Sequence, residues 1–407
     1  MKTILATAYD VNPYKGSEAG TGWNFILQIA RFNNVVAVTR KNNRLNIERY
    51  VKEFKIDASK IIFYYYDFPY YLRFWKRGAR GSSLYFYLWQ MFMPLFIKKN
   101  NIQFDITHNI NFHADAFPTF LWRLGKPTVW GPINHNERIP RQYIISRREL
   151  IKDRLKWLIK LINWNLDPFV HTSKKKVSFV LGGNSSVKKR LKLPNERFLK
   201  MSQVAAKDLG FVTKNKIDKF TVLVVGRLIP IKSFDVALKA FDQFYEKLSL
   251  EQKNQVQLKI VGSGPLKQSL HSLVDGLVCK EAIGFTGWVE YQEMEEYYRD
   301  ASVFMFTSHE GGGMVVAEAL SFGLPVICFD NFGPGELVDS QCAIRIPYSD
   351  YQKSIEDYSY AISLLYLNKP LMGRMSQSAR ELYENKYTWN AKGIVLKDIY
   401  NSIDRKL

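Results

Sequence analysis

The sequence predicts an α/β protein of two domains, each built on a doubly wound parallel sheet. The chain has 407 residues, whereas one domain usually has roughly 100–200, so two domains are expected. Short apolar runs of strand length alternate with helical patterns in both halves of the chain. A continuous apolar run such as Phe220–Val225 is typical of a parallel strand that is buried on both faces.

The first half opens with an apolar run, residues 3–8, that predicts a buried strand rather than a secretory signal. A glycine-rich turn and a helix over Gly22–Phe32 are expected to follow it. The further strands expected in this half are Asn34–Val38, Lys60–Tyr65, Asp105–Thr107, Pro127–Trp130 and Val177–Leu181. Residues 1–205 form the expected first domain.

The second half alternates more regularly, and residues 206–387 form the expected second domain. Its expected strands are Phe220–Val225, Gln257–Val261, Ile283–Phe285, Val303–Phe306 and Pro325–Phe329. Its expected helices are Ser233–Leu248, Leu266–Leu277, Glu293–Asp300 and Met314–Phe322. A last helical segment, within residues 388–407, follows no strand and is free to pack back on the first domain.

The composition limits the classes of partner. With 58 Lys+Arg against 38 Asp+Glu, the net charge of +20 suggests an anionic partner: a nucleic acid, a membrane surface or a phosphorylated substrate. Charged residues make up 24% and hydrophobic residues 46%, so a disordered chain or a coiled coil is excluded.

The cysteines Cys279, Cys328 and Cys342 are too few for a disulfide framework and fit a reducing cytoplasm.

The longest apolar stretch is Leu84–Ile97, which Gln90 and Pro94 interrupt. It is shorter than the ~20 residues that a membrane-spanning helix needs. The sequence therefore predicts a cytoplasmic protein that is not integral to a membrane.

The segment with the most chemical information follows the strand that ends at Phe306. Glu310 lies at the carboxyl end of this strand, where ligands bind in open α/β sheets. The three glycines Gly311–Gly313 then lead into a helix that carries Glu318. Free N–H groups at the start of a helix bind anions, and glycines let a ligand approach the main chain. A surface glutamate behind a flexible loop is the structural alternative.

Other loop motifs are missing. The glycines of residues 16–22 do not fit Gly-x-Gly-x-x-Gly, and Gly262-Ser263-Gly264 is a lone pair, which gives nicotinamide binding little support. The chain has neither a Walker A string nor an Asp-x-Asp pair. We therefore expect no cofactor and no metal site.

Glu310 and Glu318, with seven residues between them, resemble the paired glutamates of the retaining nucleotide-sugar glycosyltransferases of family 4. The resemblance extends over roughly residues 221–338. It includes Gly226-Arg227 with Lys232, Gly262-Ser263-Gly264-Pro265, Gly287-Trp288-Val289 and Gly333-Pro334-Gly335-Glu336. These enzymes have the GT-B fold, in which two Rossmann-like domains face each other across a cleft.

The resemblance also implies roles for single residues. Arg227 and Lys232 would bind the diphosphate as negative charge builds on the leaving group, and the N–H of Gly16 would complete this clamp. Glu310 would hold hydroxyl groups of the donor sugar, although a covalent intermediate on Glu310 stays an alternative. The remaining residues expected to contact the nucleotide sugar are Trp288, Val289, Gly311, Gly312, Gly313, Met314, Val315 and Glu318.

Histidines are assigned by the same resemblance. Either His108 or His113 is expected to contact the donor sugar, and a structural histidine is the alternative. His309 is interpreted as a spacer beside Glu310.

Two segments of the first half resemble a subset of the family that builds bacterial exopolysaccharide or envelope glycans. They are Pro13–Asn24 and Val129–Ile133. The chain departs from the pattern of the subset at Lys15 and at Asn134-His135.

Two basic runs predict peripheral contact with an anionic membrane, on the inner face of the membrane. The first interleaves Tyr71, Phe74, Trp75, Tyr85, Phe86, Tyr87 and Trp89 with arginines and lysines, and the second places Arg148, Lys152, Lys156 and Lys160 at a spacing of four. Solvated faces over a core of aromatic side chains are the alternative.

Together these features predict a retaining, metal-independent hexosyltransferase. It would move a hexose from a nucleotide-diphosphate sugar to a glycan or polyprenyl-diphosphate-linked acceptor in bacterial polysaccharide biosynthesis. The alternatives are a GT-B nucleotide-sugar epimerase, a polysaccharide phosphorylase, and a non-catalytic protein that binds a membrane or another anion. No nucleic-acid-reading motif occurs, so nucleic acid is not an expected partner.

Overall fold

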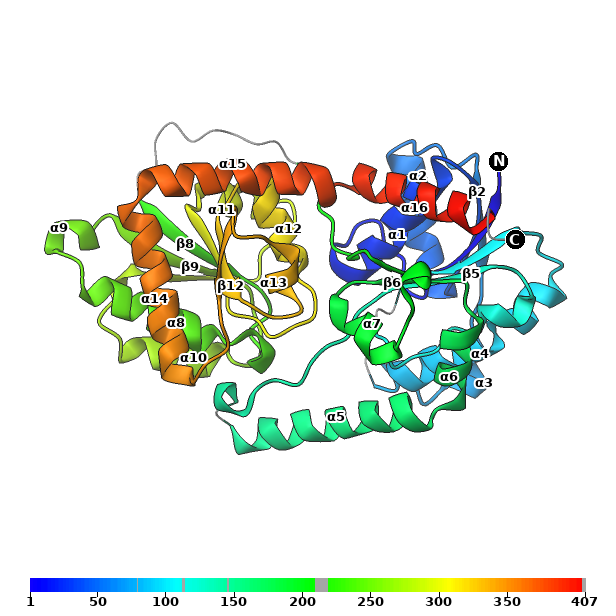
Figure 1. The fold of residues 1–407 in the computed structure, drawn as a ribbon, viewed down its shortest axis with the longest axis horizontal. Helices are drawn as coiled ribbons and strands as arrows, with labels where there is room; N and C mark the ends of the chain where they lie inside the picture. The colour runs from blue at the N-terminus through cyan, green and yellow to red at the C-terminus, as the bar shows by residue number, and fades with distance from the viewer. Residues whose placement is uncertain (79, 112–113, 145, 209–218, 405–407) are drawn as a thin grey trace. The chain divides into compact units, whose positions relative to one another are not determined.

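A computed structural model describes residues 1–78, 80–111, 114–144, 146–208 and 219–404 (Figure 1). The chain divides into two compact units. Unit 1 comprises Met1–His135, Lys156–Gln203 and Trp389–Leu407, and unit 2 comprises Asn136–Leu155 and Val204–Thr388. The chain enters unit 2 for the second time at residue 204, next to the expected boundary of 205/206. Nothing in the sequence indicated that Asn136–Leu155 belongs to unit 2.

Unit 1 contains a seven-stranded sheet with the order β3-β2-β1-β4-β5-β6-β7, in which all pairings are parallel. Its strands are β1 (Thr3–Thr7), β2 (Asn34–Thr39), β3 (Ile61–Tyr65), β4 (Ile106–Asn109), β5 (Thr128–Ile133), β6 (Phe179–Gly182) and β7 (Phe198–Lys200). Successive residues of β1 contribute to the cores on opposite faces, Ile4 to one and Leu5 to the other. This alternation is why Ile4, Leu5 and Ala6 in the middle of the strand are all apolar.

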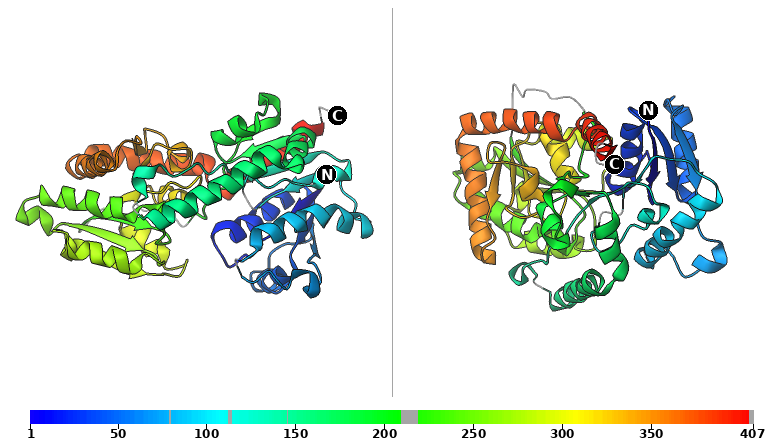
Figure 2. Two further views of the ribbon diagram at one scale, coloured as in Figure 1. Left: turned by 90° about the horizontal axis from the view of Figure 1, so that it is seen from below. Right: turned by 45° about the vertical axis from the view of Figure 1, so that its right-hand side comes forward.

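The helices of unit 1 cover both faces of this sheet. They are α1 (Ser17–Ala30), α2 (Arg44–Glu53), α3 (Tyr70–Arg73), α4 (Ser82–Lys99), α6 (Pro168–Lys176), α7 (Ser185–Leu191) and α16 (Trp389–Asp404). Side chains of α1 and α16 pack into one core, and Tyr85, Phe86 and Trp89 of α4 pack into the core on the other face. Figure 2 shows the red α16 beside the blue segments of unit 1, and α16 contacts α1 directly.

Helix α1 begins at Ser17 rather than at the predicted Gly22, so two of the glycines that suggested a turn lie inside the helix. A Cβ atom on Gly20 would lie 2.1 Å from the carbonyl oxygen of Lys15. A Cβ atom on Gly22 would lie 2.5 Å from the carbonyl oxygen of Asp10. These two glycines are therefore needed because the helix packs closely on the loop before it. The prediction that they form a turn is wrong.

Unit 2 contains a six-stranded parallel sheet with the order β10-β9-β8-β11-β12-β13. Its strands are β8 (Phe220–Val225), β9 (Val256–Val261), β10 (Ile283–Gly287), β11 (Val303–Phe306), β12 (Val326–Phe329) and β13 (Ala343–Ile346). From β8 the chain adds strands in one direction as far as β10, and β11 then returns to the other side of β8. The sheet therefore has its topological switch point between β8 and β11.

Helices cover both faces of the second sheet as well. They are α8 (Phe234–Glu246), α9 (Leu250–Lys253), α10 (Lys267–Asp275), α11 (Met294–Asp300), α12 (Met314–Ser321), α13 (Pro334–Leu337), α14 (Tyr351–Leu367) and α15 (Lys369–Lys386). One core joins α8, α10 and α14 to the sheet, and the core on the opposite face joins α11, α12 and α15 to it. The predicted architecture of two doubly wound parallel sheets is confirmed.

Helix α5 (Arg147–Leu166) carries the chain from unit 2 into unit 1. Short 3-10 turns complete the secondary structure: η1 (Lys41–Asn43), η2 (Leu121–Leu124), η3 (Arg141–Tyr143), η4 (Asn195–Arg197), η5 (Pro230–Lys232) and η6 (Lys280–Ala282). Over the described part of the chain, every helix is too short or too polar to cross a bilayer.

Candidate active site

Three predicted site residues of the second half lie at the switch point of the second sheet. Arg227 and Lys232 lie in the loop and the turn that follow β8, and Glu310 lies in the loop that follows β11. These two strands are neighbours and parallel, so both loops leave the same edge of the sheet. Open α/β sheets bind their ligands at this place.

Lys232 and Glu310 form an ion pair. The Nζ of Lys232 donates a hydrogen bond of 2.7 Å to Oε1 of Glu310, and both side chains are largely shielded from solvent. The same Nζ lies 4.6 Å from the centre of the Phe306 ring, a cation–π contact. The carbonyl oxygen of Lys232 accepts a hydrogen bond of 2.8 Å from Thr307 Oγ1. The loops after β8 and β11 are thus joined by main-chain and side-chain bonds.

Arg227 differs from Lys232 because its side chain is exposed. Among the described residues, its guanidinium has no ion-pair or hydrogen-bond partner. A guanidinium presents five donors in a planar fork that fits two phosphate oxygens. Arg227 is therefore placed to bind an anion without first breaking a contact within the protein.

The glycines of the loops that follow β8 and β9 allow close main-chain packing. A Cβ atom on Gly262 would lie 1.9 Å from the carbonyl oxygen of Gly226, and one on Gly264 would lie 2.5 Å from that of Leu228. Gly226 itself has a φ of +156° and lies under the side chain of Lys232. The loop after β9 consequently supports the loop that carries Arg227.

Helix α12 begins at Met314 and has no side-chain cap at Gly313. The amides of Met314 and Val315 have no partner inside the helix and form part of the positive end of its dipole, whereas the N–H of Val316 donates a hydrogen bond of 3.0 Å to the carbonyl oxygen of Gly313. Just before the helix, the N–H of Gly311 donates a hydrogen bond of 2.9 Å to Asn136 Oδ1, and Gly312 lies between Gly311 and the cap. Asn136 belongs to unit 2, and no feature of the sequence had singled it out.

His309 is a positioning residue rather than a spacer. Its ring is buried and stacks on Phe329 with centroids 5.0 Å apart. Its Nε2 lies 2.9 Å from Ser233 Oγ, and its Nδ1 lies 2.8 Å from the hydroxyl of Tyr348. Burial lowers the pKa of His309 to about 3, so the imidazole is neutral at physiological pH. These contacts fix the main chain beside Glu310.

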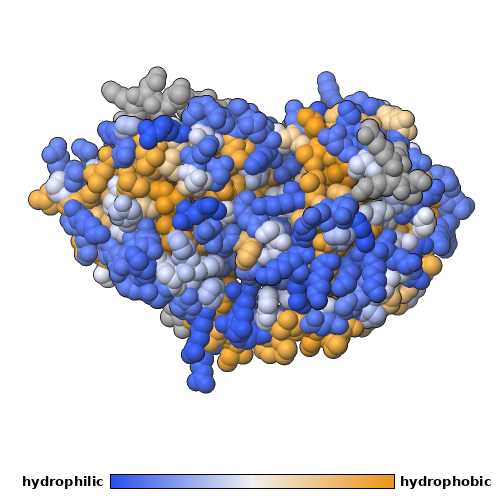
Figure 3. Space-filling model, viewed as in Figure 1, coloured by the Kyte–Doolittle hydropathy of each residue, from blue (hydrophilic) through white to orange (hydrophobic). Residues whose placement is uncertain are grey.

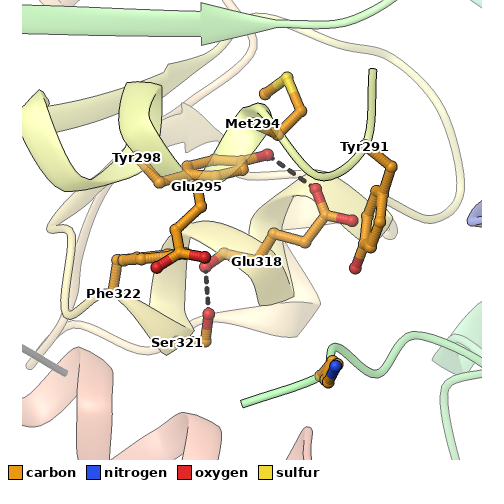
Figure 4. A pocket seen from close by; sticks show the side chains of 8 residues that line it. Tyr291, Met294, Glu295, Tyr298, Glu318, Ser321 and Phe322 are labelled. Carbon is orange, nitrogen blue, oxygen red and sulfur yellow. Dashed lines mark hydrogen bonds between the residues drawn. The ribbon is translucent and has the colours of Figure 1, made fainter. Parts of the chain in front are cut away.

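Glu318 lies in the wall of a small pocket on unit 2, beside Tyr291, Met294 and Tyr298 (Figure 4). The hydroxyl of Tyr298 donates a hydrogen bond of 2.8 Å to Oε2 of Glu318, and the Tyr291 ring lies near the same carboxylate in the figure. Burial raises the pKa of Glu318, and the bond from Tyr298 partly opposes this effect. The free oxygen of the carboxylate can accept hydrogen bonds from a diol.

Trp288 and Val289 follow β10 at the same edge of the sheet. The Trp288 side chain is 68% exposed, so its ring is available for stacking on a planar ligand. The N–H of Gly262 donates a bond of 2.8 Å to the carbonyl oxygen of Gly287, which ties this loop to the one after β9. Gly287 has a φ of +76°, a conformation that glycine adopts without strain.

The predicted site residues of the first half lie in unit 1. Gly16 is the N-cap of α1. His108, on β4, is fully buried: its Nε2 lies 2.6 Å from the carbonyl oxygen of Gly131, and its Nδ1 lies 2.6 Å from the hydroxyl of Tyr400. Both ring nitrogens are thus occupied, and the structural alternative describes His108 better than a sugar contact. His113 lies outside the described residues.

No group of three or more His, Cys, Asp and Glu side chains in the described part of the chain could hold a metal ion. A metal-independent reaction stays a prediction. The anion-binding groups that the structure offers at the switch point are Arg227, Lys232 and the start of α12.

One part of the expected membrane surface is wrong. Tyr85, Phe86 and Trp89 belong to the buried core of unit 1 and are at most 1% exposed. Tyr71 and Phe74, by contrast, are exposed.

The helical pattern of α4 was missed in the sequence because Pro94 and polar residues interrupt its apolar run.

Comparisons with known proteins give the class to which these features point. Residues 208–382 match the family model "Glycosyl transferases group 1". This segment contains all the predicted site residues of unit 2 and none of unit 1. The match and the fold together support a GT-B glycosyltransferase.

Particular relatives are similar over the same part of the chain. An uncharacterized glycosyltransferase of Haemophilus influenzae is 32% identical over 178 residues, which are 42% of this chain and 47% of that protein. A GDP-mannose-dependent monoacylated α-(1-6)-phosphatidylinositol monomannoside mannosyltransferase of Corynebacterium glutamicum is 27% identical over 49% of this chain and 50% of its own length. The α-monoglucosyldiacylglycerol synthase of Acholeplasma laidlawii is 32% identical over 40% of this chain and 38% of its own length. The chain thus spans about half or less of the length of these relatives.

Solved structures share the fold over almost the whole chain. The structure of Anabaena HepE with UDP and glucose has a TM-score of 0.62 at 13% identity, and the alignment covers 99% of this chain and 100% of that one. The pneumococcal O-GlcNAc transferase GtfA with UDP and GlcNAc has a TM-score of 0.64 at 13% identity, with 99% of each chain covered. The predicted GT-B class of fold is confirmed by these likenesses.

Proposed function

We propose that this protein is a retaining hexosyltransferase of family 4 that uses a nucleotide-diphosphate sugar and needs no metal ion. The observation that carries the proposal is the group at the switch point of the second sheet. There an exposed arginine with no partner among the described residues, a lysine–glutamate pair and an uncapped helix start share one edge of the sheet. A donor diphosphate and its sugar need these chemical groups side by side.

The leaving group determines the roles of the cations. When the bond between the sugar C1 and the phosphate oxygen breaks, negative charge grows on the nucleoside diphosphate. Arg227 would bind two of its oxygens, and Lys232 and the amides of Met314 and Val315 would stabilise the rest. Preorganised donors of this kind contribute most when charge develops in the transition state.

Glu310 would position the donor sugar. Its carboxylate is already paired with the Lys232 ammonium, which makes it a weaker nucleophile and leaves oxygen lone pairs for sugar hydroxyls. This arrangement supports attack by the acceptor hydroxyl on the face that the leaving group vacates. The new C1–O bond then forms while the acceptor proton passes to the leaving phosphate, and the anomeric configuration is retained.

The nucleoside would occupy the surface near Glu318 and Trp288. Glu318 would accept hydrogen bonds from the ribose hydroxyls, and the exposed Trp288 and the neighbouring Val289 would contact the base. Gly311, Gly312 and Gly313 would let the sugar approach the main chain. The predicted contribution of the Gly16 N–H stays a prediction.

The acceptor would be a glycan or a polyprenyl-diphosphate-linked glycan of a bacterial polysaccharide. The names of two of the similar proteins contain a glycolipid, a phosphatidylinositol monomannoside in a mannosyltransferase and a monoglucosyldiacylglycerol in a synthase, which supports an acceptor linked to a lipid. Peripheral association with an anionic membrane on its cytoplasmic face is part of this proposal.

A thermal-shift panel tests the donor site. Wild type is measured with UDP, GDP, ADP, TDP and CDP, because a ligand that binds only the folded state raises stability by about 2.7 kcal/mol at 100 Kd. One diphosphate should raise the Tm of wild type and fail to raise that of Arg227→Ala. Arg374→Ala, which removes an exposed arginine on α15, is the matched control and should respond like wild type.

Product analysis separates the enzyme classes. Incubation of the matching nucleotide sugar with a lipid-linked acceptor should release the diphosphate and give a product with the donor's anomeric configuration. An altered sugar with the nucleotide still attached would indicate an epimerase. If no diphosphate shifts the Tm of wild type, the proposed donor site is wrong.

A further inference from the structure

Helix α5 exposes an unusual row of apolar side chains. Ile151, Leu155, Leu158, Ile159, Ile162 and Leu166 are each at least 48% exposed. Their spacing returns to the same side of the helix at every turn, so they form one continuous apolar stripe. Figure 3 shows apolar residues along the edge of the surface where Figure 1 places α5.

The opposite side of α5 packs on the protein. The Trp164 side chain is buried, and its ring lies 4.9 Å from that of His135. The guanidinium of Arg190 lies 4.2 Å from the centre of the Trp164 ring. The helix is therefore held in place by one face while the apolar stripe points to solvent.

Basic side chains border the stripe on both sides. On a helix of 3.6 residues per turn, Lys152 and Lys156 lie on one flank, and Arg147 and Arg154 lie on the other. The helix has only two acidic residues, Glu149 and Asp153, which lie away from the stripe. Glu149 pairs with Lys152 at 2.7 Å and Asp153 pairs with Arg154 at 3.1 Å.

Further exposed side chains of interfacial character lie in unit 1, which also contains the C-terminal half of α5. Tyr70 and Tyr71 of α3 are each more than 70% exposed, and Phe74 follows them. The hydroxyl of Tyr87 donates a bond of 2.8 Å to Asp167, which ties α4 to the residue that follows α5. Tyrosine is enriched where a membrane meets water.

We infer that α5 is an in-plane membrane anchor, and that its stripe enters the boundary between headgroups and acyl chains of an anionic phospholipid bilayer. An apolar face bordered by lysine and arginine is the pattern of helices that lie in such an interface. The long basic side chains can reach the lipid phosphates while their stems stay among the apolar atoms. The net charge of +20 attracts the whole protein to the same surface.

Vesicle flotation tests this inference independently of the proposed enzyme activity. The full chain is mixed with vesicles of phosphatidylcholine alone or with one third phosphatidylglycerol. Wild type should float only with the anionic vesicles. Leu158→Asp/Ile162→Asp should reduce the bound fraction at least tenfold, whereas Leu250→Asp/Leu367→Asp, at even more exposed positions outside α5, should bind like wild type.

The charge requirement needs its own pair of variants. Each lysine near an anionic surface contributes about a fivefold factor to binding, so Lys152→Gln/Lys156→Gln should bind about 25-fold less tightly. Lys369→Gln/Lys386→Gln makes the same change of charge on α15 and should have a much smaller effect. The melting temperature of each variant checks that it is folded.

Three results would overturn the inference. Wild type could stay unbound with anionic vesicles, or the Leu158/Ile162 variant could float as wild type does. Light scattering could also show that wild type is an oligomer that this variant dissociates, in which case a second copy of the chain covers the stripe instead of a bilayer.

Discussion

The ammonium of Lys232 and the carboxylate of Glu310 meet at 2.7 Å, although 78 positions separate the two residues in the chain. Each was expected to bind a different part of the donor, the diphosphate and the sugar. The ion pair shows that these two parts of the proposed site are adjacent. It also means that the glutamate is held in place, and its charge balanced, before any donor arrives.

Replacement of Lys232 by methionine should lower kcat by about 10²–10³, because a preorganised cation is lost where charge develops. Binding of the nucleoside diphosphate should weaken as well, since Glu310 would then repel the phosphate. Single-turnover rates and the Kd of the diphosphate measure the two effects. Lys247→Met, at an exposed position beyond α8, should leave both unchanged. Equal rates for the two variants would contradict the proposed role of Lys232.

Gly333 should not tolerate a side chain. A Cβ atom there would lie 1.8 Å from the carbonyl oxygen of Glu310, so Gly333→Ala must displace the loop that carries the glutamate. We expect a large fall in kcat and a lower Tm. Gly373→Ala is the matched control: this glycine lies inside α15 with no atom within 4 Å of an added Cβ, and alanine there should stabilise the helix by up to about 1 kcal/mol. A Gly333→Ala enzyme with wild-type kcat would show that the loop geometry is not required.

Acid should destabilise the protein before its carboxylates titrate. Burial lowers the pKa of His108 to about 4 and that of His309 to about 3, from a usual value of 6.5. Below pH 6.5 these histidines therefore bind protons in the unfolded chain but not in the folded chain. The free energy of unfolding, which has its full value above pH 6.5, falls as the pH drops toward 4. Each histidine contributes a slope of up to about 1.4 kcal/mol per pH unit.

Urea unfolding at several pH values between 7 and 4.5 measures this slope. His108→Gln should be less stable than wild type at pH 7 and should lose less stability on acidification. His271→Gln, at an exposed position on α10, should keep the wild-type slope. If His108→Gln has the wild-type slope too, proton uptake by this buried histidine does not drive the acid loss.

The fold was predictable where local pattern and tertiary packing agree. The run Phe220–Val225 is buried at every position, and apolar at all but Thr221, because both faces of β8 are covered, and its strand was predicted with the observed bounds. The start of the first helix was predicted too late because a glycine can form a turn or can allow close packing inside a helix. Only the contacts of Gly20 and Gly22 show that these two glycines allow close packing. Strand β13 was missed because it is short and Arg345 interrupts its apolar pattern.

The residues of the candidate site also differ in whether the local sequence indicates them. Arg227, Lys232 and Glu310 were assigned by resemblance to a family, and they could be placed at one edge of the sheet because the loops that carry them follow strands that are recognisable in the sequence. The contact of Asn136 with Gly311 spans 175 positions and has no local signature. His309 was interpreted as a spacer for the same reason, since its partners Ser233 and Tyr348 come from other loops.

Helix α16 also constrains the order in which the protein can fold during translation. Leu396, Ile399 and Tyr400 belong to a core of unit 1, and the Tyr400 hydroxyl meets His108 inside it. A ribosome must make Val204–Thr388 between the last strand of unit 1 and this helix, which takes roughly 10–40 s at the usual rate of synthesis. The part of the protein that is synthesised first is thus the part whose core is completed last, and its unfinished apolar face is open to chaperones throughout that interval.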